Sequence, residues 1–432
     1  MADVLRVGLL GCGNVGAAVV RMLHEHAEEI ERRSGRRIEV ARVAVRDPGR
    51  DRRVPCPRER FTAHPFDVVR DPEVDVVVEL IGGIEPPRSL LLEAFAHGKP
   101  AVTANKELLA TCGRELFEAA GAAGVDLLYE AAVGGGIPLI RPLREHLAGD
   151  RISRFVGIVN GTTNYVLTRM TEDGASLQEA VAEARALGYA EADPTDDVEG
   201  HDAAAKAAIL ATIAFDVPVS AADVYREGIS GVTAEDIRAA RRLGYVVKLL
   251  AIAEADGGAV SVRVHPAMIP ADHPLASVRE SFNAVYVEGE RVGPLMLYGR
   301  GAGGDPTATS VVGDIIDLAR GGGGAASHLP AFVLPEGPTR RLRPIEELEA
   351  QYYLLLEVVD RPGVLAAIAR AFADHGVSIK SVWQEGRGDE AQIVLVTHRA
   401  TERDLRATVE DLRGLDVVEE VRSVLRVEGA EP

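Results

Sequence analysis

Three glycines near the N-terminus limit what the first part of this chain can fold into. Gly11, Gly13 and Gly16 follow the apolar run VLRVGLL at 4–10 and precede a segment whose apolar residues recur at helical spacing. In a strand–turn–helix unit of this kind, one glycine allows the tight turn, one lets a pyrophosphate approach the backbone, and one allows close packing of the helix. We therefore predict a dinucleotide site, with a purely structural turn as the alternative.

Strand and helix patterns alternate over the first third of the sequence. Short apolar runs recur at 38–45, 74–80, 101–104 and 125–133. Helical patterns lie between them at 17–30, 87–98 and 106–124. This order predicts a Rossmann domain, with a doubly wound parallel sheet, over residues 1–133.

Two further domains are expected after the first. Residues 134–318 mix long helical and strand-like segments, which predicts an α+β domain for substrate binding and dimerisation, whose last helix packs back on the first domain. Glycines and prolines at 319–350 indicate a linker. Residues 351–428 follow the order βαββαβ of a ferredoxin-like domain. The whole chain is therefore expected to be an α/β protein.

The net charge and the cysteines limit the classes of partner. The formal net charge is -18, whereas proteins that bind nucleic acids or anionic membranes usually carry a basic excess. The three cysteines show no paired or metal-type spacing, which argues against a disulfide framework or a zinc site. The N-terminus enters a strand pattern without a signal peptide. We expect a cytoplasmic protein with small-molecule partners.

The end of the second predicted strand bears on which dinucleotide binds. A carboxylate there would hold a ribose 2′-hydroxyl, and an arginine would accept a 2′-phosphate. The sequence places Arg46 first and Asp47 second, and residues 31–60 hold eleven arginines against five acidic residues. This pattern favours NADP, and Asp47 keeps NAD as the alternative.

An acidic stretch precedes a nearly uncharged helix. Six carboxylates between Glu191 and Asp202 come before Lys206, the only charged residue from Ala203 to Phe215. Asp202 and Lys206 stand four apart and so share a helix face. Burial lowers the pKa of an amine, which makes Lys206 a candidate general acid with Asp202 orienting it. A structural buried ion pair would give the same pattern.

A nicotinamide enzyme that reduces a carbonyl needs a separate proton donor, because its coenzyme delivers only a hydride. Lys206 would give that proton to the carbonyl oxygen. The remaining carboxylates would suit a substrate that carries an ammonium group. Three of them, Asp193, Asp196 and Glu199, fit turns, caps or solvated charges as well.

Seven segments, in this order and spacing, resemble homoserine dehydrogenases across nearly all of residues 5–318: GLLGCGNVG, ELIGG, VTANK, YEAAVGGGIP, GIVNGTTNY, LGYAEADPTDDVEGHDAAAK and GRGAGGDPTATSVVGDI. The resemblance implies NAD(P)-dependent interconversion of L-aspartate 4-semialdehyde and L-homoserine, on the route to threonine, methionine and isoleucine. It also implies a substrate with an ammonium group and a proton donor at Lys206.

The resemblance carries over to further residues. Lys106 resembles a second active-site lysine, although a cation at the start of an ordinary helix is the alternative. The substrate-binding residues that it implies are Gly188, Glu191, Asp197, Asp202, Asn160 and Thr162, and for the last two a helix cap is the simpler alternative. With the glycine pattern, the expected cofactor-binding residues are Gly11, Gly13, Asn14, Val15, Gly16, Arg46, Thr103, Lys106 and Gly303.

One glycine-rich segment resembles the monovalent cation site of the same family, which usually holds sodium. The matching residues are Glu130 and the carbonyls of Val133, Gly135 and Ile137. Oxygen ligands suit a hard cation. A flexible turn is the alternative for such a glycine run.

The segment VVDRPGVLAAIARAF at 358–372 resembles the entry loop of an ACT domain, a small fold that commonly binds amino acids between paired copies. Asp360 and Gly363 lie at its first strand-to-helix turn, where helix N–H groups would meet a ligand carboxylate. Regulation by threonine and assembly as a homodimer or homotetramer are therefore expected. A purely dimerising module is the alternative.

Two other functions fit the same motifs. One is a different NAD(P)-dependent dehydrogenase of an amino-acid semialdehyde. The other is a catalytically silent sensor that binds a nucleotide and an amino acid. The presence of both Lys106 and Lys206 argues against the sensor.

Overall fold

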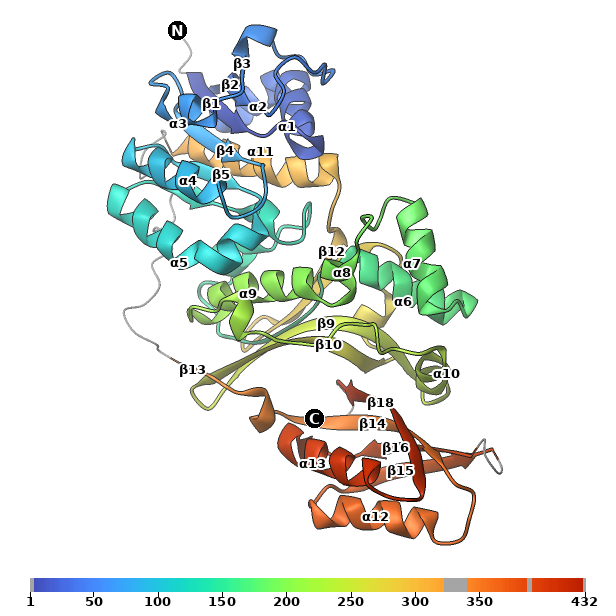
Figure 1. Ribbon diagram of the computed structural model, residues 1–432. Coiled ribbons are helices and arrows are strands. Elements are labelled where there is room, and N and C mark those ends of the chain that lie inside the picture. Colours follow the sequence, from blue (N-terminus) through green and yellow to red (C-terminus); the bar gives the residue numbers. More distant parts are fainter. Residues whose placement is uncertain (1–3, 322–339, 387–390, 430–432) are drawn as a thin grey trace. The chain divides into compact units, whose positions relative to one another are not determined.

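The computed structural model describes residues 4–321, 340–386 and 391–429 (Figure 1). Much of the predicted linker, residues 322–339, lies outside the described residues. The chain divides into two compact units. Unit 1 comprises Met1–Ser153, Ala205–Asp223 and Asn283–Arg340, and unit 2 comprises Arg154–Ala204, Val224–Phe282 and Arg341–Pro432.

A parallel sheet forms the centre of the N-terminal part of unit 1. Its strands run in the order β3-β2-β1-β4-β5-β6, and every neighbouring pair is parallel. The strands are β1 Val4–Leu10, β2 Arg37–Ala44, β3 Phe61–Thr62, β4 Val76–Glu79, β5 Ala101–Thr103 and β6 Leu127–Leu128. The strand order reverses between β1 and β4, and open sheets of this type bind ligands outside the carboxyl ends of such strands. The predicted Rossmann sheet is confirmed.

Helices cover this sheet. They are α1 Asn14–Glu25, α2 Ala27–Ser34, α3 Pro65–Arg70, α4 Pro87–Ala96, α5 Lys106–Ala123 and α11 Gly304–Arg320. Figure 1 shows α11 alongside α1, and both helices contribute buried side chains to one core with the sheet. The prediction that the helix before residue 318 packs on the first domain is therefore confirmed.

Two predicted elements of unit 1 differ in detail. The helix predicted at 17–30 is two helices, because the backbone leaves helical geometry at His26. The strand predicted at 125–133 ends at Leu128 and is followed by a 3-10 turn, Glu130–Ala132. The reason is a long-range contact: the Glu130 N–H donates to the Asp314 carboxylate at 2.9 Å, and not to a neighbouring strand.

A second sheet runs through unit 2 in the order β7-β9-β10-β18-β14-β16-β15. These strands are β7 Ile152–Ile158, β9 Tyr245–Asp256, β10 Ala259–Pro270, β14 Glu349–Val358, β15 Ile379–Glu385, β16 Gln392–Thr397 and β18 Val418–Val427. Parallel pairing of β10 with β18 joins the central segment to the C-terminal segment. The C-terminal helices, α12 Val364–Asp374 and α13 Glu402–Arg413, pack side by side (Figure 1). This is the predicted βαββαβ order.

The remaining elements position the candidate site. Unit 2 holds α6 Gly161–Asp173, α7 Leu177–Ala186, α8 Thr195–Val198, α10 Ala234–Arg242 and the short strands β8 Tyr225–Arg226, β13 Arg341–Leu342 and β17 Ala400–Thr401. The predicted helix around Lys206 is α9, His201–Phe215. The strands β11 Phe282–Gly289 and β12 Gly293–Arg300 come later in the chain. Among the described residues, no helix has the length and apolarity needed to cross a membrane.

Candidate active site

The three N-terminal glycines each meet a different steric requirement. Gly11 has φ +95°, and a side chain there would place Cβ 2.7 Å from the carbonyl oxygen of Leu80. A Cβ on Gly16 would lie 2.3 Å from the carbonyl oxygen of Gly11. A Cβ on Gly13 would meet nothing within 4 Å. Gly11 and Gly16 therefore serve the packing of the turn, and Gly13 leaves open space at the start of α1.

The largest of the described cavities, about 1090 Å³, adjoins this turn. It is lined by Gly11, Gly13 and Asn14, by the end of β2, and by Gly304. Helices α1 and α11 begin after Gly13 and Gly303, and neither glycine supplies a side-chain cap. Uncapped helix N–H groups are suited to bind phosphate oxygens. Val15 lies in the first turn of α1 and is packed against the core of unit 1.

Basic side chains outnumber acidic ones in the lining of this cavity. Five arginines line it, namely Arg21, Arg46, Arg50, Arg52 and Arg53. Asp47, the competing carboxylate, also lines it, but its Oδ1 already accepts the Gly49 N–H at 2.9 Å in a tight turn. Arg46 therefore lies at the predicted place, while Asp47 is engaged in its own loop.

A buried carboxylate that the sequence motifs did not single out organises the edge of the sheet. Glu79, which is 0% exposed, ends β4 and accepts the backbone N–H of Ile81 at 2.7 Å. It also accepts the Thr103 hydroxyl at 2.6 Å. Thr103 is itself 0% exposed, so its side chain contributes to this network. The ELIGG motif includes Glu79, but nothing in the motif indicates that its partner is Thr103, 24 residues later.

The same network fixes the start of α5, where Lys106 is the first residue. The Asn105 side chain caps the helix by accepting the Leu108 N–H at 3.0 Å. Its amide donates to the carbonyl oxygen of Gly83 at 2.6 Å, and its backbone N–H donates to the Thr103 hydroxyl at 3.1 Å. Lys106 is half-buried, and its position depends on these contacts.

Two of the predicted carboxylates in unit 2 share one amide. The Asn160 Nδ2 group donates to Asp197 Oδ1 at 2.6 Å and to Asp202 Oδ2 at 2.8 Å. Asn160 also caps α6, because its Oδ1 accepts the Thr163 N–H at 2.8 Å. Asn160 is therefore both a helix cap and a link between the carboxylates. We call Asn160, Asp197 and Asp202 the acidic cluster.

The remaining predicted substrate residues lie on the loops beside this cluster. The Thr162 hydroxyl donates to the carbonyl oxygen of Tyr189 at 2.7 Å, which ties the loop after α7 to α6. Gly188 has φ +78°, as the turn after α7 requires. Glu191 is exposed, whereas Asp202 is 7% exposed. The structure therefore brings Asn160, Asp197 and Asp202 together, and leaves Glu191 at the loop surface.

Helix α9 is buried along almost its whole length, as its composition predicts. Residues 202–205 and 207–213 are buried, and Lys206 between them is partly accessible. Asp202 and Lys206 lie one turn apart on one face of this helix. Because its helical neighbours are buried, Lys206 is the one charged group that this part of α9 exposes in part.

The predicted cation segment is built around Glu130. Its Oε1 accepts the N–H groups of Leu139 and Ile140 at 2.5 and 2.8 Å, and its Oε2 accepts that of Arg141 at 2.8 Å. The carboxylate is thus occupied by backbone donors. The loop that follows turns at Gly134 and Gly135, with φ of +74° and +52°, and the carbonyl oxygen of Gly135 accepts the Ser310 hydroxyl at 2.6 Å.

Two buried ionisable residues were missed by sequence reasoning. Burial raises the pKa of Asp314 to about 7, although Arg141 opposes the shift. Burial lowers the pKa of Lys248 to about 8. The Lys248 amine donates to the Asn164 side chain at 2.9 Å and to the Val278 carbonyl oxygen at 2.6 Å. Each stands alone in an apolar run, which is the one sequence signal that would have indicated a buried charge.

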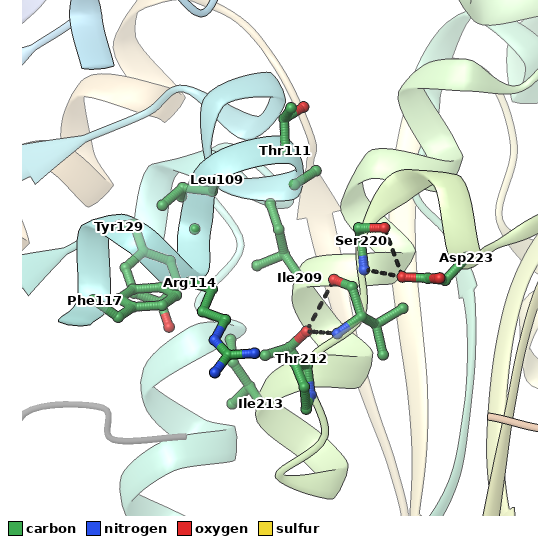
Figure 2. Close-up of a pocket in the computed structure, with 14 residues that line it drawn as sticks. Leu109, Thr111, Arg114, Phe117, Tyr129, Ile209, Thr212, Ile213, Ser220 and Asp223 are labelled. Carbon is green, nitrogen blue, oxygen red and sulfur yellow. Dashed lines mark hydrogen bonds between the residues drawn. The ribbon is translucent and has the colours of Figure 1, made fainter. Parts of the chain in front are cut away.

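A smaller cavity, about 180 Å³, lies between α5 and α9 (Figure 2). Leu109, Ile209 and Ile213 supply apolar walls, and Thr212 exchanges hydrogen bonds with Val219 at its edge. None of the predicted site residues lines it. Arg114 and Asp223 are the two charged residues in its lining.

In the C-terminal segment, Asp360 and Gly363 occupy the predicted turn between β14 and α12. Gly363 has φ +95° and precedes α12 without giving it a side-chain cap. The first turn of α12, which has no side-chain cap, therefore lies at the place where the sequence predicts an amino-acid ligand.

Three family models match the chain. The model "Homoserine dehydrogenase, NAD binding domain" matches residues 11–130, "Homoserine dehydrogenase" matches 138–316, and "ACT domain" matches 352–417. The matches follow the chain order of the nucleotide cavity, the acidic cluster and the C-terminal segment.

Whole-chain relatives and structures agree with these models. Homoserine dehydrogenases from Corynebacterium glutamicum and Mycobacterium tuberculosis are 49% and 50% identical to the chain, and each alignment covers 98% of the chain and 95% or 97% of the relative. The crystal structure of a homoserine dehydrogenase from Thiobacillus denitrificans is 44% identical, with a TM-score of 0.93 over 99% of both chains. With the glycine turn and the acidic cluster, these matches show that the chain belongs to the homoserine dehydrogenases, the oxidoreductases that interconvert L-aspartate 4-semialdehyde and L-homoserine.

Proposed function

We propose that Lys206 gives the proton to the carbonyl oxygen of L-aspartate 4-semialdehyde when the aldehyde is reduced. The observation that carries this proposal is the single accessible amine in an otherwise buried helix, one turn after the buried carboxylate of Asp202. NADPH, when bound, supplies the hydride for the carbonyl carbon. The developing negative charge on the oxygen then needs a nearby cation and a proton, and a lysine ammonium supplies both.

The acidic cluster would bind the other end of the substrate. An α-ammonium group needs carboxylate or carbonyl acceptors, and Asp197 and Asp202 are held in one orientation by Asn160. Gly188 and Thr162 would shape the adjoining loop. We assign Glu191 to the same end of the substrate, which it would reach from the exposed loop after α7.

Replacing Lys206 with alanine tests the proton-transfer role. We expect kcat to fall by about 10²- to 10⁴-fold, the range for a lost general acid, while the Kd of NADPH stays within about twofold. Lys206→Arg keeps the positive charge but not a transferable proton at neutral pH, so it should lose nearly as much turnover. A Lys206→Ala enzyme with near-normal kcat would rule out this role.

Lys106 is proposed as the second active-site cation. Its place at the start of α5 is fixed by the Asn105 cap and by the contact of Asn105 with Gly83. A lysine held there would neutralise charge on the coenzyme or the substrate. Lys106→Ala should therefore raise the Michaelis constant of NADPH, the semialdehyde, or both, whereas Lys106→Arg should retain most of the binding.

NADPH is proposed as the preferred coenzyme. The support is the five arginines that line the large cavity and the hydrogen bond of Asp47 with the Gly49 N–H. A hyperthermophilic archaeal homoserine dehydrogenase, 27% identical with a TM-score of 0.64, has been solved in complex with NADPH. Gly13, Asn14, Gly303 and the start of α11 would hold the phosphates. A strong preference of the enzyme for NADH in steady-state assays would contradict this proposal.

A sodium ion is proposed in the loop after Glu130. Since the Glu130 carboxylate accepts three backbone N–H groups, the ligands would be main-chain carbonyl oxygens, those of Glu130, Val133, Gly135 and Ile137. Carbonyl oxygens are suitable ligands for a hard cation. The enzyme should lose activity when NaCl is replaced by tetramethylammonium chloride at equal ionic strength, and regain it on addition of NaCl.

Threonine is proposed as the effector of the ACT domain. The support is the uncapped start of α12 after Gly363. Threonine at millimolar concentration should inhibit the enzyme and raise its melting temperature, and Asp360→Ala should weaken both effects. Unchanged activity and melting temperature would favour a purely dimerising module.

The enzyme is also proposed to act as a homodimer or homotetramer in the cytoplasm. The edge strand β15 exposes Val382 and Trp383, at 36% and 43%, and exposed apolar side chains on a sheet edge favour pairing with another copy. Cys12, Cys56 and Cys112 are free thiols, which suits a reducing compartment. Light scattering of the purified enzyme, with Trp383→Lys as the disrupting variant, tests the assembly.

A further inference from the structure

The segment formed by β8 and the residues after it contacts two separate parts of unit 2. β8 pairs in parallel with β10, and the Glu227 N–H continues this pairing by donating to the Val264 carbonyl oxygen at 2.8 Å. Neighbouring residues of an extended chain point to opposite sides. Arg226 and Glu227 therefore reach different partners.

On one side, the segment fixes the corner that separates the two carboxylates of the acidic cluster. The Arg226 guanidinium donates to the carbonyl oxygen of Glu199, and the Ile229 N–H donates to that of Val198 at 2.8 Å. A Cβ on Gly228 would lie 2.5 Å from the same Val198 oxygen, so the two backbones are in direct contact. Val198 and Glu199 lie between Asp197 and Asp202 in the chain, so a shift of this corner would move the two carboxylates relative to each other.

On the other side, the segment is held by the C-terminal domain. The Glu227 carboxylate accepts the two terminal nitrogens of Arg426 at 2.9 and 3.0 Å. Arg426 belongs to β18 and its side chain is only 4% exposed. Arg426 also donates to Glu402 at the start of α13, at 2.7 and 3.0 Å, and to the Tyr225 hydroxyl on β8 at 3.3 Å. The two parallel bonds between Arg426 and Glu227 fix the orientation of the Glu227 carboxylate as well as its distance from Arg426.

Stability alone is a weak reason for such a pair. Arg426 is buried and Glu227 is only partly buried. Taking the Arg426 charge out of water costs about as much as its attraction to Glu227 returns, so the pair adds little net stability. It does fix geometry, because any displacement leaves a buried charge unpaired. The Glu227–Arg426 pair is therefore better suited to hold the segment after β8 in one position than to stabilise the fold.

We propose that Glu227 and Arg426 are positioning residues for the substrate site, through which the C-terminal domain holds the Val198–Glu199 corner and so the spacing of Asp197 and Asp202. This inference rests on the proposed assignment of the acidic cluster to the substrate ammonium. It also gives β18 of the ACT domain a structural connection to substrate binding. Substrate affinity, and not NADPH affinity, is the quantity that depends on it.

A pair of matched glutamates allows a direct test in the full-length enzyme. Glu227 and Glu235 both accept an arginine of β18, Arg426 and Arg422, and their side chains are 35% and 33% exposed. Glu235 lies on α10 and its arginine does not contact the 198–199 corner through any described bond. Glu227→Gln and Glu235→Gln therefore remove comparable charges, with only the former linked to the acidic cluster.

Glu227→Gln should raise the KM of aspartate semialdehyde about tenfold, because a displaced carboxylate of the acidic cluster would lose one charge-assisted hydrogen bond to the substrate ammonium. Its kcat and the KM of NADPH should stay within about twofold, since the acidic cluster would hold the substrate ammonium equally in the ground state and the transition state. Glu235→Gln should leave all three values within about twofold. Equal effects of the two variants, or a Glu227→Gln enzyme that loses NADPH and semialdehyde binding together, would overturn the proposal.

A second variant covers the case in which Glu227→Gln folds poorly. Arg426→Lys keeps the charge but loses the two-point geometry, and should raise the semialdehyde KM by an intermediate factor with little change in melting temperature. An unchanged KM in a well-folded Arg426→Lys enzyme would also overturn the proposal. Asp202→Asn distinguishes failure of this inference from failure of the substrate assignment. If Asp202→Asn raises the semialdehyde KM and Glu227→Gln does not, only the positioning role of Glu227 is refuted. If Asp202→Asn has no effect on that KM, the assignment of the acidic cluster to the substrate is refuted.

Discussion

The region proposed for the coenzyme in unit 1 is built mainly from backbone groups, whereas the region proposed for the substrate in unit 2 is built from side chains. The large cavity in unit 1 depends on glycine backbones and on the uncapped starts of α1 and α11. The acidic cluster in unit 2 depends on side chains that lie 37 and 42 residues from Asn160 in the chain. A backbone site is encoded in a few consecutive residues, whereas a side-chain site requires the whole tertiary arrangement.

This difference predicts different responses to mutation. In a backbone site, a single methyl group can obstruct the ligand or the turn, while most side chains can change freely. In a side-chain site, each polar group matters through its partners, and its loss leaves buried groups without hydrogen bonds. The following variants test the contrast, beginning with the largest expected effect.

Gly13→Ala and Gly16→Ala separate ligand contact from packing in unit 1. The Gly13→Ala methyl group meets no protein atom within 4 Å and should leave the melting temperature unchanged, while NADPH binding weakens by about tenfold or more because phosphate hydrogen bonds are obstructed. Gly16→Ala places its methyl group 2.3 Å from the Gly11 oxygen and should cost about 3 kcal/mol of unfolding free energy. Thermal unfolding and NADPH titration distinguish the two. A Gly13→Ala enzyme that loses stability but keeps NADPH affinity would break the comparison.

Lys248→Met probes the side-chain network beneath α6. The pKa of Lys248 is lowered to about 8 in the folded enzyme by burial, and an unfolded lysine keeps its proton up to about pH 10.4. Between these values the unfolded state binds more protons, so this residue adds stability as the pH rises. Below about pH 8 the folded enzyme carries a protonated, buried Lys248, whose desolvation lowers the free energy of unfolding.

The measurement is the unfolding free energy of both enzymes at pH values from 7.5 to about 10. The wild-type value minus the Lys248→Met value should increase by up to ~1.4 kcal/mol per pH unit within the window. Other titrating groups are shared by the two proteins and cancel in the difference. Parallel pH profiles would show that Lys248 titrates as an exposed lysine does.

Arg46→Ala should have a smaller effect, confined to one coenzyme. An arginine that binds a 2′-phosphate contributes a charge-assisted contact, so its loss should raise the KM of NADPH by about tenfold and leave that of NADH within about twofold. Arg50→Ala, from the same wall of the cavity, shows whether the phosphate is held by one arginine or shared. Equal losses with both coenzymes would assign Arg46 to the general stability of the loop.

What the sequence could predict follows the same division. The nearly uncharged helix around Lys206 and the Rossmann sheet were predicted because apolar runs, glycines and helical periodicity are local features. The short elements β8 and α8 were not predicted. β8 is stabilised by its pairing with β10, and the Val198 carbonyl oxygen at the end of α8 accepts the Ile229 N–H. No local pattern marks such elements.

Single side chains show the limit more clearly. The family resemblance indicated Asp202, but not that Asn160 bridges it to Asp197. The sequence shows Glu79, Glu227 and Arg426 as ordinary charges in strands or beside them, and nothing nearby in the chain names their partners. The Glu227–Arg426 contact joins residues 199 positions apart, so only the folded structure reveals it.

The most direct test of this account is the pair of Michaelis constants of Asp202→Asn, measured with aspartate semialdehyde and with NADPH. Asparagine keeps the shape and removes the charge that would face the substrate ammonium. We predict that the KM of the semialdehyde rises by about tenfold or more, while that of NADPH stays within about twofold. An unchanged semialdehyde KM, or an equal rise in both constants, would contradict the separation of a backbone site for the coenzyme from a carboxylate site for the substrate.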